Sequence, residues 1–152
     1  MTTRILTLVG GFALCTLLTC GDPVSGQPPP NPGTVSWATG YPKGVNSTPP
    51  PPMFVPAYIK YSGTYTANPG WTPAKAVGYW MEVKGGGGSV PTPFTMDLQN
   101  GAIGRFDATG KLVPVQVTFT AGTYQAWMAV TYQDGNKNFV ASLSSVQTVT
   151  LK

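Results

Sequence analysis

Short runs of alternating apolar and polar residues, separated by turn residues, fill the chain from residue 53 to its end. Side chains point alternately to the two faces of a strand, so this pattern predicts strands that bury one face. Asn100-Gly101, Thr109-Gly110 and Asp134-Gly135 contain residues that can adopt positive φ, which favours tight hairpins. No ten-residue stretch has the period of an amphipathic helix. The predicted strands span 57–66, 75–84, 94–98, 102–107, 112–120, 123–133, 138–143 and 146–151.

The number and spacing of these strands predict the fold class. Seven or eight short strands within about a hundred residues indicate an all-β fold, an antiparallel β-sandwich of two sheets. We therefore expect one β-sandwich domain over residues 53–152.

The alternation also assigns the faces of two strands. In 123–133 the apolar positions predict the core face, namely Tyr124, Ala126, Met128, Val130 and Tyr132. The opposite face of that strand is polar except for Trp127. In 75–84 the larger apolar side chains predict the core face, namely Val77, Tyr79, Met81 and Val83. Trp80 is then left on the outer face, and if the two strands are neighbours it projects beside Trp127.

The N-terminus predicts export. Arg4 is followed by fifteen uncharged, mostly apolar residues, 5–19. A membrane-spanning helix needs about 20 apolar residues, whereas the apolar part of a signal peptide needs about 7 to 15. Residues 1–19 are therefore predicted to be a signal peptide.

The end of that segment, Leu17-Leu18-Thr19-Cys20-Gly21, resembles the lipobox of bacterial lipoproteins. In that family the cysteine thiol takes a diacylglycerol and becomes the new N-terminus. The resemblance implies lipidation of Cys20 and a membrane anchor at the bacterial cell envelope. The alternative is ordinary cleavage further along, for instance after Gly26, which would give a secreted chain without a lipid.

A proline-rich stretch follows. Eleven of the sixteen prolines lie within residues 21–56, with only a short apolar interlude at 35–41. Runs of proline favour an extended polyproline II helix, which cannot build a core. Residues 20–52 are therefore predicted to be a disordered stalk between the anchor and the domain. A proline-rich ligand for a partner with an aromatic groove is the alternative.

Composition excludes several kinds of chemistry. The chain has no histidine and is only 9% charged, which removes histidine-based acid–base catalysis and the usual zinc sites. Its carboxylates are scattered: Asp22, Glu82, Asp97, Asp107 and Asp134. The lysines are dispersed, whereas nucleic-acid binding needs a basic patch. We expect no catalytic residue, metal, cofactor or nucleic-acid partner.

The last strands carry a family resemblance. Gly122-Thr123-Tyr124 opens a strand with alternating apolar residues, Asp134-Gly135 follows as a turn, and a Val-Thr-rich strand ends the chain. This pattern resembles the end of an immunoglobulin-like domain of the PKD type. The resemblance implies an immunoglobulin-like sandwich used for spacing, adhesion or ligand presentation; the fold does not decide which.

Together these features predict a non-enzymatic interaction or structural module of the cell envelope, with an envelope protein or polysaccharide as possible partner. The alternative is a carbohydrate-binding module in which Trp80 and Trp127 stack on sugar rings, since an indole offers a large contact area at low entropic cost. Equally, residues around Trp37 could cover both rings, or each could be a cross-strand pair that supports the sheet.

Overall fold

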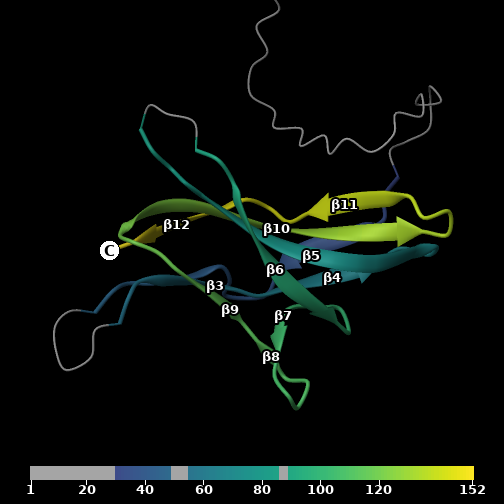
Figure 1. Cartoon of the computed structure of the whole chain (residues 1–152), viewed down its shortest axis with the longest axis horizontal. Helices are drawn as coiled ribbons and strands as arrows, with labels where there is room; N and C mark the ends of the chain where they lie inside the picture. Colours follow the sequence, from purple (N-terminus) through teal and green to yellow (C-terminus); the bar gives the residue numbers. More distant parts are fainter. Residues whose placement is uncertain (1–29, 49–54, 86–88) are drawn as a thin grey trace, which may run out of the picture.

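The computed structural model describes residues 30–48, 55–85 and 89–152, and every regular element in these ranges is a β-strand (Figure 1). All paired strands run antiparallel, so the predicted all-β, antiparallel class is confirmed. Within these residues no helix is long and apolar enough to cross a membrane. The predicted signal peptide, Cys20 and the first part of the predicted stalk lie outside the described residues.

The strands are β1 (Gly33–Trp37), β2 (Lys43–Val45), β3 (Tyr58–Tyr61), β4 (Gly63–Ala67), β5 (Trp71–Glu82), β6 (Thr92–Gln99), β7 (Ala102–Phe106), β8 (Leu112–Val113), β9 (Val115–Thr118), β10 (Gly122–Asp134), β11 (Phe139–Leu143) and β12 (Gln147–Leu151). A nine-stranded sheet has the order β1-β4-β7-β6-β5-β10-β11, with β12 also on β10 and β8 on β7. A three-stranded sheet has the order β2-β3-β9.

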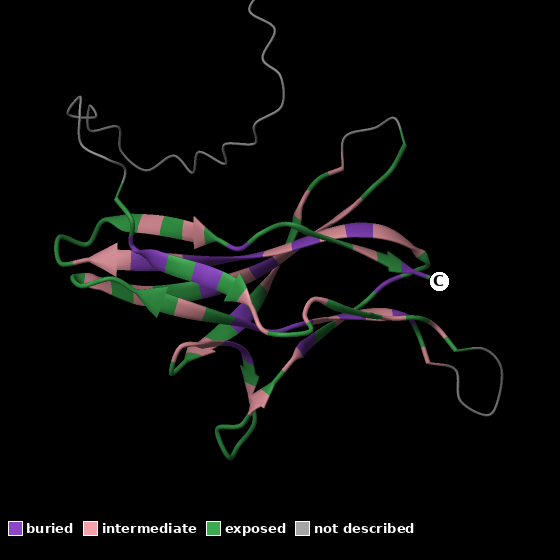
Figure 2. Ribbon diagram, turned by 180° about the vertical axis from the view of Figure 1, so that it is seen from behind, coloured by how far each residue is buried: buried purple, intermediate pink, exposed green. Residues whose placement is uncertain are grey.

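The long sheet folds over on itself at β6. The first half of β6 pairs with β5, whereas residues 97–99 pair with β7. We call β5, β10, β11, β12 and the first half of β6 the β10 layer. The remaining strands lie opposite it, and Figure 2 shows the two layers separating at one end of the molecule. A sandwich-like arrangement of two packed layers results.

Hydrogen bonds close the layers at the opposite end, where β1 packs against β10 and β11. The Tyr132 hydroxyl lies 3.1 Å from the Thr34 carbonyl oxygen and 2.8 Å from that of Thr66. The Ser142 hydroxyl donates to the Gly33 carbonyl over 2.8 Å. These side chains of the β10 layer therefore hold the paired strands β1 and β4 against it.

The core lies between the layers, and β10 provides its centre. Tyr124, Ala126, Met128, Val130 and Tyr132 are all buried, the last four of them with no exposed surface. The inward set predicted for this strand is therefore confirmed. Ile59 and Tyr61 of β3 and Ile103 of β7 face them from the opposite layer and are also fully buried.

The face assignment of β5 is wrong. Register pairs Trp80 with Ala126 and Gly78 with Met128, so these residues of β5 share the inward face of β10. At Gly78 a neighbouring aromatic ring already fills the space, so a side chain there would collide with the ring of Phe94. Trp80 is a large residue on the same inward face. The predicted core residues Val77, Tyr79 and Met81 are on the outer face, where they are half-buried, and Val83, just after β5, is 48% exposed.

The predicted limits of the stalk and the domain also need correction. Residues 33–37 and 43–45, expected in the stalk, form β1 and β2 and pair with β4 and β3. Val35 of β1 is buried in the core, and the Trp37 ring packs on Tyr61 with centroids 5.6 Å apart. The apolar interlude thus belongs to the sandwich because it supplies side chains to the core. Residues 49–52 of the predicted stalk lie outside the described residues.

Several strand boundaries differ as well. The predicted strand 57–66 is divided at Ser62 into β3 and β4, and the Ser62 carbonyl accepts a hydrogen bond from the Ala38 N–H. The strand 112–120 is divided at Pro114, which has no N–H to donate to a ladder. The number of strands in the described residues therefore exceeds the seven or eight predicted.

Two of the three predicted hairpin turns use the expected residues. Asn100 and Gly101 both have positive φ, 48° and 80°, between β6 and β7. Gly110 has a φ of 78° in the turn after β7. In the turn between β10 and β11 the left-handed residue is Lys137, with a φ of 66°, rather than Gly135. Three residues separate Asp134 from Asn138, and a three-residue hairpin loop places its left-handed residue last.

Candidate functional site

The outward face of the β10 layer gathers apolar and uncharged side chains from adjacent strands. We call it the outer face, and by register it comprises Val77, Tyr79, Met81, Pro93, Thr95, Gln125, Trp127, Ala129, Thr131, Ala141 and Leu143. None of these residues is charged. The charged residues of this side of the layer lie at one end: Lys75 is paired with Thr131, and Asp97 follows Thr95 along β6. The centres of protein interfaces are similarly depleted of charge and enriched in aromatic residues and methionine.

A stacked aromatic pair stands at the centre of the outer face. Trp127 of β10 lies directly opposite Tyr79 of β5, and the ring centroids are 5.4 Å apart with an interplanar angle of 8°. One face of each ring is therefore covered by the other ring. The pair braces β5 against β10 while both side chains stay half-buried at the surface.

Trp80 is on the other side of the sheet, so the predicted platform of Trp80 and Trp127 on one face is wrong. The Trp80 ring meets Phe119 edge-on at 5.0 Å and Tyr124 at 6.1 Å, both inside the sandwich. Register places Trp80 on the inward face of β5 with Ala76 and Gly78, because Trp80 lies opposite Ala126 of β10. The residue paired with Trp127 is Tyr79, which the sequence had placed in the core.

The half-buried Trp80 also lines a small hollow at the end of β5. Its volume is about 260 Å³, and its other lining residues are Glu82, Lys84, Ser89, Val90 and Thr92. Glu82 and Lys84 form an ion pair of 3.0 Å at its rim. The hollow thus combines an aromatic ring with a carboxylate, an ammonium group and two hydroxyls. Such a combination can bind a small polar ligand.

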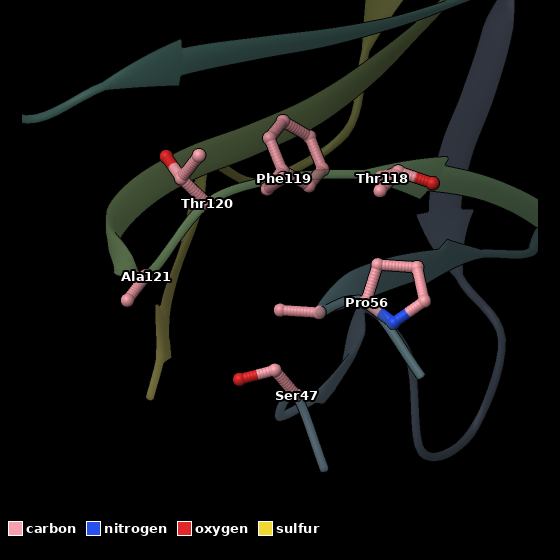
Figure 3. Close-up of a pocket in the computed structure, with 7 residues that line it drawn as sticks. Ser47, Pro56, Thr118, Phe119, Thr120 and Ala121 are labelled. Carbon is pink, nitrogen blue, oxygen red and sulfur yellow. The ribbon is translucent and has the colours of Figure 1, made fainter. Parts of the chain in front are cut away.

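A larger depression of about 510 Å³ opens at the end of the molecule where the layers separate (Figure 3). The rings of Phe119 and Pro56 face it, and the hydroxyls of Ser47, Thr118 and Thr120 lie around it. The Ser47 hydroxyl donates to the Lys152 carbonyl over 3.1 Å. The lining contains no carboxylate, amine or thiol, so its described residues can hold an apolar group but offer no acid or base.

Two of the described carboxylates are bound within their own hairpin turns. The Asp134 carboxylate accepts hydrogen bonds from the Asn138 side-chain amide at 2.9 Å and from the N–H groups of Asn136 and Asn138 at 2.8 Å each. These bonds, the Asn138 side chain first, lower the pKa of Asp134 below its usual value. Within the described residues no group of three or more His, Cys, Asp or Glu side chains is placed to hold a metal ion.

The Asp107 carboxylate is likewise bound within its own turn. Its carboxylate accepts hydrogen bonds from the Thr109 hydroxyl at 2.6 Å, the Thr109 N–H at 2.9 Å and the Lys111 N–H at 3.0 Å. The Thr109 side chain contributes most to lowering the pKa of Asp107. Both aspartates therefore stabilise turns.

Comparison of the chain with protein-family models, with curated proteins and with solved structures gives no match. The outer face, the Trp80 hollow and the N-terminal sequence are the features of the chain that bear on its function.

Proposed function

We propose that this protein is an exported, non-enzymatic interaction module of the bacterial cell envelope, anchored by a lipid on Cys20, and that it binds its partner through the outer face. The observation that carries the proposal is the uncharged outer face centred on the Tyr79–Trp127 pair. Exposed apolar surface that spans several strands marks binding sites on soluble domains. The Pro-rich residues between Cys20 and the described domain support the proposal because they can act as a spacer from the membrane.

The strand order supports an immunoglobulin-like sandwich as the specific fold. In the spatial order of the sheet, β6, β5 and β10 correspond to strands C′, C and F of such domains, and β11 and β12 together correspond to strand G. The neighbours β2, β3 and β9 correspond to A, B and E. Immunoglobulin-like domains serve many unrelated functions, so this support concerns architecture and leaves the partner to be identified by binding experiments.

Binding to cell envelope isolated from the bacterium that produces the protein tests the role of the outer face. The chain is compared as Trp127→Ala and as Val113→Ala, the latter being an exposed residue of β8 outside the outer face. We expect Trp127→Ala to weaken binding by about tenfold or more, because aromatic residues at interface centres dominate affinity. Equal binding by both variants would contradict the proposal.

Mass spectrometry of the mature N-terminus tests the anchor separately. An acyl mass on Cys20 is expected if the lipobox is used. A free N-terminus near Gln27 would show secretion without a lipid and would overturn this part of the proposal while leaving the outer face untouched.

A carbohydrate ligand is the second candidate, and the Trp80 hollow favours it. Sugars are held by ring stacking on an aromatic residue together with hydrogen bonds to nearby polar groups. A glycan array with the unaltered chain, with Glu82→Gln and with Trp127→Ala distinguishes the two candidates. Binding that is lost in Glu82→Gln but kept in Trp127→Ala would favour the hollow over the outer face.

A further inference from the structure

The borders of the sheets differ in how they are protected against pairing with another strand. Strand β6 contains Pro93, which removes an N–H from that border, and β2 carries Lys43. The end of β12 is held by Ser47, whose N–H donates to the Lys152 carbonyl over 3.1 Å. Proline, lysine and coverage are common means of blocking a sheet border. The edge strands β1, β9 and β11 (Phe139–Leu143) contain neither proline nor charge, and of these three only β11 exposes large apolar side chains.

Only one side of β11 is paired within the described residues. The Asn138 carbonyl accepts from the Asp134 N–H, and the Ser144 N–H donates to the Met128 carbonyl, at the two ends of the β10–β11 ladder. Because hydrogen-bonding direction alternates along an antiparallel strand, residues 138, 140, 142 and 144 turn their backbone groups toward β10. Phe139, Ala141 and Leu143 therefore turn theirs away from it.

The same three residues expose their side chains. Phe139 is 45% exposed and Leu143 is 58% exposed, and Ala141 lies between them on the outer face. Figure 1 shows β11 at the border of the molecule, with β10 on one side of it. An apolar edge strand with unpaired N–H and C=O groups is a template for the addition of another strand.

We propose that a second copy of this chain pairs with β11, forming an antiparallel dimer about a two-fold axis through Ala141. The register of the strand is self-complementary: Ala141 faces its own copy and Phe139 faces Leu143 of the other chain. All three pairs are then hydrogen-bonded pairs, because the free N–H and C=O groups belong to these residues. Each apolar side chain is covered by an apolar side chain, with no charge in the paired strands.

This symmetry joins the two outer faces. A two-fold axis normal to the sheet does not exchange its two faces. The β10 layers of the two copies therefore form one continuous sheet, with both outer faces on the same side. The dimer itself does not depend on the proposed function. If the outer face binds a repetitive envelope partner, two linked faces would bind it with increased avidity.

A disulfide across the axis tests the proposal in the full chain. The α-carbons of a hydrogen-bonded antiparallel pair are about 5.5 Å apart, which a disulfide can span. Under mild oxidation, Ala141→Cys is expected to give a covalent dimer on non-reducing gels. Val146→Cys is the matched control, since Val146 is similarly exposed, 56%, but lies outside the paired strand. The unaltered chain measures any background from Cys15 and Cys20.

A second substitution in the Ala141→Cys chain tests the apolar contact. Leu143→Lys places a charge beside Phe139 of the other copy and is expected to lower the cross-linked fraction by about tenfold, whereas Val146→Lys leaves it unchanged. Thermal unfolding of each variant verifies its fold. The proposal is overturned if Ala141→Cys gives no more dimer than Val146→Cys, or if the two lysine variants lose cross-linking equally. Neither result depends on binding to the envelope.

Discussion

At the scale of single residues, the two turn aspartates connect sequence, structure and pH dependence. Asp107 and Asp134 each accept three hydrogen bonds within one hairpin turn, and these bonds favour the ionised carboxylate. Local side-chain bonds of this kind fix the direction in which the chain reverses. Their carboxylates therefore help to position the strands that each turn joins.

The lowered pKa of Asp134 predicts acid sensitivity. Its pKa in the folded state lies below the usual value, which is about 3.9 in an unfolded chain. The carboxylate therefore contributes stability above about pH 4 that is lost as the pH falls through the folded pKa. Asp134→Asn is expected to show a smaller fall in Tm between about pH 5 and pH 2 than the unaltered chain. Asp97→Asn, in β6 rather than in a turn, is the control.

Gly78 tests the packing that sets the orientation of β5. A Cβ at this position would collide with the Phe94 ring, so Gly78→Ala is expected to lower the free energy of unfolding by about 1–3 kcal/mol. Gly135→Ala is the matched control because no atom lies within 4 Å of the added carbon. Chemical denaturation of both variants measures the difference. Equal stabilities would contradict the inward placement of Gly78.

At the scale of strands, β1 and β2 make the N-terminal part of the described chain integral to the fold. The hydroxyl of Tyr132 lies within hydrogen-bond distance of the carbonyls of Thr34 and Thr66, so its one proton is shared between the paired strands β1 and β4. Val35 adds a buried side chain to the core. Removing β1 would take away the Thr34 carbonyl that faces the Tyr132 hydroxyl and the buried Val35 side chain.

The domain boundary can be tested by truncation. A chain beginning at residue 53 lacks β1 and β2 and is expected to lose cooperative thermal unfolding, whereas a chain beginning at residue 30 retains it. Circular dichroism during heating measures both. An unchanged Tm for the shorter chain would show that the first two strands are dispensable.

The sequence allowed the class of the fold and the inward face of β10 to be predicted, because large apolar residues alternate there with polar ones. Alternation failed in β5, where both sets contain aromatic residues and the choice depends on the volume left by Phe94. The β1 strand was missed because Pro32 and Pro42 flank a short apolar run whose partner, β4, lies about thirty residues away. For the same reason Tyr79 was not predicted to stack on Trp127: that contact requires the register between β5 and β10.

At the scale of the whole molecule, the inward and outward faces of the layers differ in composition. The inward faces contain the core, and the outward face of the β10 layer presents uncharged side chains from several strands. A partner that covers this face would bury Tyr79 and Trp127 together, while Trp80 remains on the opposite side of the sheet.

Hydroxyl-radical footprinting of the chain, free and bound to isolated host envelope, tests this arrangement most directly, because it needs no substitution and reports each aromatic residue separately. On binding, oxidation of Tyr79 and Trp127 should fall together, and that of the exposed Val113 on β8 should remain unchanged. Undiminished oxidation of Tyr79 and Trp127 in the bound chain, or protection confined to the Trp80 hollow, would contradict the assignment of the outer face as the binding surface.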